Sequence, residues 1–77
     1  MTNTAMLRQK IKDSGLQLKK ICILLNMTYA TLRSKINNVG EFTANEIRIL
    51  TTLLNLSQEE TWQIFLTKSV NVTNEGD

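Results

Sequence analysis

The chain of 77 residues has no proline, no histidine, one cysteine and three glycines. A single cysteine cannot form an internal disulfide, and without histidine the scattered carboxylates do not make a zinc site. No segment approaches the roughly 20 apolar residues of a membrane span, and the polar start MTNTAMLRQK lacks the apolar stretch of a signal peptide. We therefore expect a soluble, cytoplasmic protein with no metal, no cofactor and no small-molecule ligand.

The same absences argue against an enzyme. There is no histidine and no glycine-rich phosphate loop, and Cys22 falls on the apolar face of an expected helix, where a small core residue is the simplest interpretation. A chain of this length fills one small domain and buries about 60% of its unfolded surface. We expect a single domain over residues 1–68. Residues 69–77 have no helical periodicity and are expected to be a flexible tail.

The charges are unevenly divided along the chain. Residues 1–40 contain seven lysines and arginines against one aspartate, which gives +6, whereas residues 41–77 contain two against six carboxylates, which gives −4. Such asymmetry favours an N-terminal half that meets a polyanion. A solvated charged surface is the alternative.

Apolar periodicity predicts helices over 4–14, 18–25, 29–37, 44–54 and 58–66. Gly15 and Asn26 are expected to end the first two in the left-handed conformation, and Thr28 to cap the third. The segments TANE, from Thr43, and SQEE, from Ser57, both fit the capping box and should open the last two helices.

The same periodicity predicts the core. Trp62 should either anchor the fifth helix in the core, the interpretation we favour, or contact a second subunit. The other expected core residues are Leu7, Ile11, Leu16, Ile21, Cys22, Leu25, Leu32, Ile36, Ile47, Leu50, Leu53, Leu54, Phe65 and Leu66.

Residues 21–36, ICILLNMTYATLRSKI, have the order of small, apolar and polar residues of a helix-turn-helix. Two helices that cross steeply need a small residue at the contact, here Cys22, and a tight turn, here Asn26. Leu32 and Ile36 are four residues apart and share one helical face. The other faces of the third helix, with Tyr29, Ala30, Arg33, Ser34 and Asn37, are what a major groove would contact.

Five short helices with the turn between the second and third resemble the Cro/repressor-type, lambda-repressor-like family. The likeness covers residues 5–66, in SGL, LLNMTYATLRSKINN and FTANEIRILTTLLNLSQEETWQIFL. The last segment looks most like small Cro-like proteins of prophages and mobile elements in low-GC Gram-positive bacteria. The resemblance implies an all-α fold of five helices, with a helix-turn-helix formed by the second and third.

In that family the third helix enters the major groove, while the start of the second helix and the loop after the third face phosphates. Leu18 stands where the family often has a glutamine, so that phosphate contact is either missing or supplied by Gln17. Asn26 replaces the usual turn glycine. The base-reading residues implied are Thr28, Tyr29, Ala30, Thr31, Arg33 and Ser34. The phosphate contacts implied are Gln17, Lys19, Lys35, Asn37 and Asn38.

The resemblance implies a sequence-specific DNA-binding transcriptional regulator, a Cro-like repressor that occupies an operator. Its partners would be double-stranded DNA and, chiefly on DNA, a second subunit in a weak homodimer. The alternative is a helical protein-interaction module, such as an antirepressor or assembly factor, without DNA binding.

For individual residues of the third helix, there are alternatives to a contact with a DNA base. Arg33 could pair with guanine or contact a phosphate or solvent. Tyr29 could reach a base or pack over Leu25. Ala30 and Thr31 could contact a thymine methyl or simply allow close approach.

Overall fold

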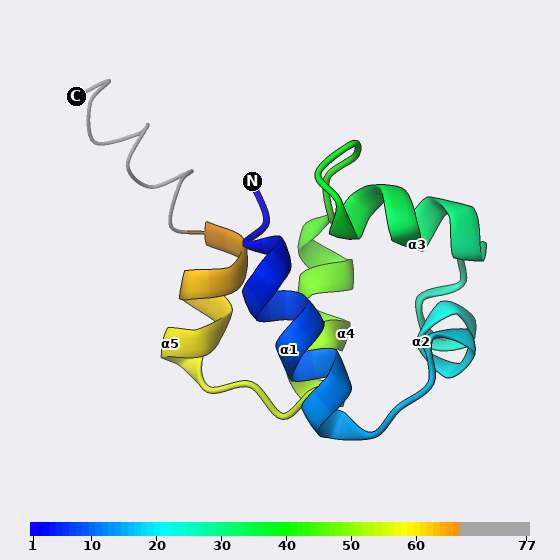
Figure 1. The fold of residues 1–77 in the computed structure, drawn as a ribbon. Coiled ribbons are helices and arrows are strands. Elements are labelled where there is room, and N and C mark those ends of the chain that lie inside the picture. The colour runs from blue at the N-terminus through cyan, green and yellow to red at the C-terminus, as the bar shows by residue number, and fades with distance from the viewer. Residues whose placement is uncertain (67–77) are drawn as a thin grey trace.

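The computed structural model describes residues 1–66 (Figure 1). The predicted tail over 69–77 and the side chain of Leu66 lie outside this description. The helices are α1 (Thr4–Ser14), α2 (Leu18–Leu25), α3 (Tyr29–Ile36), α4 (Ala44–Leu53) and α5 (Gln58–Thr61), which runs into a π-helical turn, η1 (Trp62–Leu66). Residues 1–66 contain no strand, and the prediction of an all-α protein is confirmed.

Local chemistry sets the helix ends. Gly15 (φ 75°) and Asn26 (φ 56°) terminate α1 and α2 in the left-handed region, as predicted. The hydroxyl of Thr28 accepts a hydrogen bond from the backbone N–H of Thr31 and so caps α3. Both predicted capping boxes, from Thr43 and from Ser57, are formed. The third and fourth helices each end one residue earlier than predicted.

One apolar core joins all the helices. In Figure 1, α1 lies at the centre, with α5 on one side and the α2–α3 pair on the other. The rings of Phe42 and Phe65 meet edge to face, with centroids 5.6 Å apart. The buried apolar residues are Leu7, Ile11, Ile21, Cys22, Leu25, Leu32, Ile36, Phe42, Leu50, Leu54, Leu56, Ile64 and Phe65, with Leu16, Ile47 and Leu53 packed against them.

The end of α5 corrects the sequence prediction. Trp62 is 42% exposed, so it is not the core anchor that we favoured, whereas Ile64 is fully buried. The reason is the change to π-helical geometry at Trp62, because a wider turn breaks the i, i+3 relation that placed Trp62 with Phe65. The backbone N–H of Asn3 donates to the carbonyl of Ile64 and fixes this turn against the N-terminal segment.

No helix among the described residues has the length and apolar character needed to cross a bilayer. Within the same part of the chain, no three His, Cys, Asp or Glu side chains are grouped to hold a metal ion.

Candidate nucleic-acid interface

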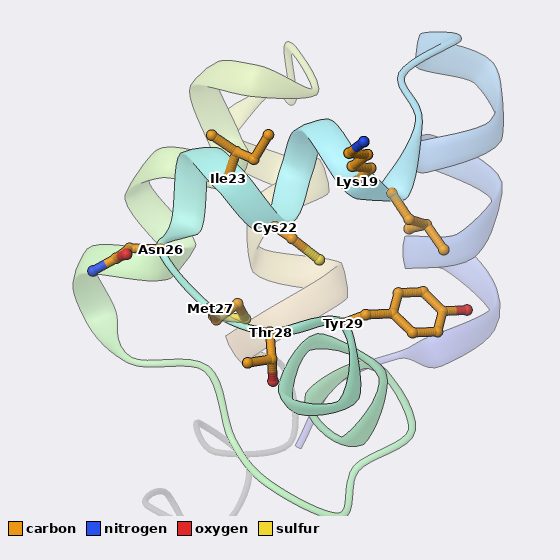
Figure 2. Close-up of a pocket in the computed structure, with 8 residues that line it drawn as sticks. Lys19, Cys22, Ile23, Asn26, Met27, Thr28 and Tyr29 are labelled. Carbon is orange, nitrogen blue, oxygen red and sulfur yellow. The ribbon is translucent and has the colours of Figure 1, made fainter.

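The turn between α2 and α3 is short and is held by backbone hydrogen bonds. After the left-handed Asn26, the backbone N–H of Met27 donates to the carbonyl of Cys22 at 3.0 Å, and α3 begins two residues later. Cys22 is buried and points from α2 toward α3 (Figure 2). Its small side chain lets the two helices approach, as the sequence predicted. This packing fixes how α3 is presented on the surface.

One face of α3 is in the core and the other is open. Leu32 and Ile36 are buried and anchor the helix. The predicted base-reading residues Thr28, Tyr29, Ala30, Thr31 and Arg33 are all exposed, whereas Ser34 is half-buried. The backbone carbonyl of Ser34 also accepts the N–H groups of Val39 and Gly40, which ties the following loop to the helix. The structure therefore leaves five of the six residues open to solvent, with Tyr29 and Arg33 lining one depression and Thr28 and Tyr29 another.

Tyr29 lies at the edge of a shallow depression between α2 and the start of α3 (Figure 2). The depression has a volume of about 800 Å³, and Lys19, a predicted phosphate contact, forms part of its lining. Gln17, the N-cap of α2, makes no side-chain capping bond, and both Gln17 and Lys19 are exposed. The start of α2 thus presents an amide and an ammonium group beside α3.

The two asparagines after α3 already have partners within the protein. The side-chain oxygen of Asn37 accepts a 2.7 Å hydrogen bond from Nη2 of Arg8. The side-chain amide of Asn38 bonds both the backbone N–H and the carbonyl of Thr2, each at 2.8 Å. Asn38 therefore holds the N-terminal segment, a use that its polar character alone did not indicate.

Lys35 is paired with a carboxylate. Its Nζ lies 2.7 Å from Oε1 of Glu46, and the two side chains are only 17% and 16% exposed. Burial by itself raises the pKa of Glu46, but the hydrogen bonds from Lys35 and from the backbone N–H of Thr43 outweigh it, so the pKa lies below its ordinary value. The charge of Lys35 is therefore largely balanced by Glu46 within the fold.

A second ion pair has the same design. Lys10 of α1 bonds Glu60, the acidic residue of the second capping box. The hydrogen bond from Lys10, followed by that from the backbone of Ser57, lowers the pKa of Glu60. These are the two ion pairs among residues 1–66, and the cations of α1 to α3 outside them are Arg8, Lys12, Lys19, Lys20 and Arg33.

Sequence reasoning gave Arg8 no individual role. In the structure its guanidinium bonds Asn37, 29 positions away, and lines a depression with Tyr29 and Arg33. The available signal was the excess of cations in the first half of the chain, which does not say which of them lie beside α3. Comparison with protein-family models, with curated proteins and with solved structures found no match.

Proposed function

We propose that this protein is a sequence-specific, non-enzymatic DNA-binding regulator, in which α2 and α3 act as a helix-turn-helix of the lambda-repressor-like type. In this proposal α3 enters the major groove of double-stranded DNA. Occupying an operator in this way would block a promoter, so the regulator is a Cro-like repressor.

The observation that carries the proposal is the exposed face of α3 between unpaired cations. A major groove about 12 Å wide admits one α-helix. Thr28, Tyr29, Ala30, Thr31 and Arg33 face solvent on such a helix. Exposed cations lie on both sides of Tyr29, because it lines one depression with Lys19 and another with Arg8 and Arg33. This arrangement suits a strand of phosphates on either side of a helix that reads base edges.

The roles divide by position. Arg33 is suited to a bidentate contact with guanine and Tyr29 to a base edge, while Ala30 and Thr31 offer apolar surface to a thymine methyl. Ser34 lies deeper and contributes at the edge of this surface. Lys19 and Gln17 at the start of α2 would contact one phosphate backbone. Lys35 and Asn38 are engaged within the fold, so of the other three predicted phosphate contacts Asn37 is the one left to donate to the second backbone, through its NH₂ group.

A two-fold operator would bring two copies together, and we propose a weak homodimer that forms chiefly on DNA. A half-site spacing of about 10 base pairs, one turn of the duplex, is expected for such a pair. Trp62, 42% exposed at the far end of the fold, stays a predicted contact for the second copy.

A salt titration tests the proposal directly. Binding of the protein to a random-sequence duplex, followed by fluorescence anisotropy, should weaken steeply with salt, because each neutralised phosphate contributes about −0.9 to the slope of log K against log salt. Selection of bound sequences from a random pool should then return a preferred site. A slope near zero would rule out DNA binding.

One observation favours a second candidate, the protein-interaction module. Ile23 and Leu24 are neighbours on α2 and are 66% and 43% exposed, so they form a small apolar surface that a protein partner could cover. If the salt titration shows no DNA binding, this surface becomes the place to look for a protein partner.

A further inference from the structure

The side of α3 that faces α1 is hollowed by two adjoining depressions of about 230 and 150 Å³. Both are lined by Arg8, Leu18 and Ile36, so they form one continuous groove. Tyr29, Leu32 and Arg33 complete the first depression, and Ile11 and Lys12 the second. We call this the α1–α3 groove.

The charge in the α1–α3 groove is of one sign. Arg8, Lys12 and Arg33 are part of its lining, and no carboxylate is. None of the three is in an ion pair with a residue of the described part of the chain. Their combined charge is therefore left to attract an anion.

Arg8 is held in place by a neutral group. Nη2 of Arg8 donates to Oδ1 of Asn37 at 2.7 Å, which orients the guanidinium without neutralising it. Because the Asn37 oxygen is occupied, its NH₂ group is left to donate to an acceptor in the same region. The pair thus presents several donors to an anionic oxygen.

The floor and the size of the groove favour a phosphate group. Leu32 and Ile36 are buried beneath the cations, and an apolar floor strengthens the attraction of the cations for an anion. The two depressions are smaller than the roughly 300–1,000 Å³ of pockets that enclose organic ligands. A guanidinium fork matches phosphate oxygens in geometry.

We propose that Arg8 and Lys12 of α1 bind the phosphodiester backbone of the DNA strand that runs beside α3. The inference rests on the proposed function. It adds a contact that the sequence did not assign, because the charge asymmetry of the chain singled out neither Arg8 nor Lys12. The occupant is a DNA strand because the groove is continuous with the exposed face of α3 through Tyr29 and Arg33, which line both surfaces.

The test compares salt slopes on a random-sequence duplex. Arg8→Ala and Lys12→Ala should each flatten the slope by about one unit and weaken binding roughly five- to tenfold at moderate salt, and the double variant should lose both contributions. Arg8→Lys keeps the charge and should keep most of the slope. Arg48→Ala is the matched control, because Arg48 is an exposed cation of α4 that lines neither depression. Circular dichroism melting identifies any variant that fails to fold.

The outcomes separate the two proposals. Arg8→Lys and Arg48→Ala are expected to keep the steep salt slope of the wild type. If Lys12→Ala keeps it as well, Lys12 does not contact the DNA backbone. If Arg8→Ala also has the salt slope of the wild type, the inference is wrong, although the proposal of DNA binding stands. If the wild type itself does not bind, both fail.

Discussion

The carboxylates of α4 and α5 and the cations of α1 to α3 are used in different ways. Glu46 and Glu60 each close a capping box, and each also accepts a bond from a lysine of the first half of the chain. Arg8, Lys12, Lys19 and Arg33 instead face no carboxylate within ion-pair distance in the described residues. Glu46 and Glu60 are therefore used within the fold, whereas these four cations keep their charge available at the surface.

This difference shows that residue type alone does not determine whether a lysine forms an ion pair within the fold or lines the surface. Lys10 and Lys12 are two positions apart on α1, so they point in different directions, and Lys10 meets Glu60 while Lys12 lines the α1–α3 groove. Lys35 lies near the C-terminal end of α3 and is paired with Glu46. Which of these cations form an ion pair within the fold depends on what α4 and α5 place beside them.

The largest expected effect is a loss of stability at the contact between α2 and α3, which supports the basic surface. Cys22→Glu would place an unpaired carboxylate where α2 meets α3 and should cost more than about 3 kcal/mol of stability, enough to unfold a domain of this size. Cys22→Ala should be tolerated far better. Ile23→Glu, one residue along and 66% exposed, is the matched control and should fold. Urea denaturation gives all three values, and a stable Cys22→Glu protein would show that the packing of α2 on α3 is wrong.

The next largest effect is on the stability contributed by the π-helical turn that follows α5. Ile64→Ala removes a fully buried side chain and should cost about 2–5 kcal/mol. Trp62→Ala, two residues earlier and 42% exposed, should cost less in spite of the larger side chain. Thermal melts of the two variants decide between them. A larger loss at Trp62 would restore the anchor that the sequence suggested and contradict the π-helical turn.

Binding to DNA gives the third effect, on the basic surface itself. Tyr29→Ala and Arg33→Ala lie four residues apart on the exposed face of α3, and each should cost about 1–3 kcal/mol on the best operator and change the preferred base at one position. Affinity for random DNA should change much less. The measurement is selection of bound sequences for each variant. Selected sites identical to those of the wild type would place base reading elsewhere.

Most of the fold could be predicted from interactions between residues that are close in sequence. The ends of α1 and α2 follow from Gly15 and Asn26, and the starts of α4 and α5 from capping boxes whose partners are three residues apart. Such contacts can be read along the chain because both members lie within one turn. The exposed face of α3 was predictable for the same reason, since Leu32 and Ile36 fix the opposite face.

Contacts between distant residues could not be predicted in this way. The bonds of Arg8 to Asn37 and of Asn38 to Thr2 join positions 29 and 36 residues apart, and they exist only because α1 packs beside the end of α3. The exposure of Trp62 depends on a change of helix type, which the pattern of apolar residues does not encode.

The smallest effect separates the two ion pairs, and it rests on the proposed function. Glu46→Gln keeps the acceptor oxygen of the capping box but removes the charge that holds Lys35. It should lower stability at neutral pH by about 0.5–1 kcal/mol. It should also free the Lys35 ammonium, so binding to random DNA strengthens and the salt slope steepens by up to about one unit.

Glu60→Gln is the matched control, because it makes the same change of net charge in the other capping box and releases Lys10 of α1, whereas Glu46→Gln releases Lys35 of α3, the helix proposed to enter the major groove. Both glutamates have a lowered pKa in the folded protein, so the unfolded chain binds protons more tightly. Their contribution to stability is present above the ordinary pKa of about 4.5 and is lost as the pH falls through the lower folded value. Each variant should therefore reduce the acid dependence of the melting temperature, but Glu46→Gln alone should tighten DNA binding. Equal tightening in both would mean that net charge, and not the position of the released lysine, governs the association.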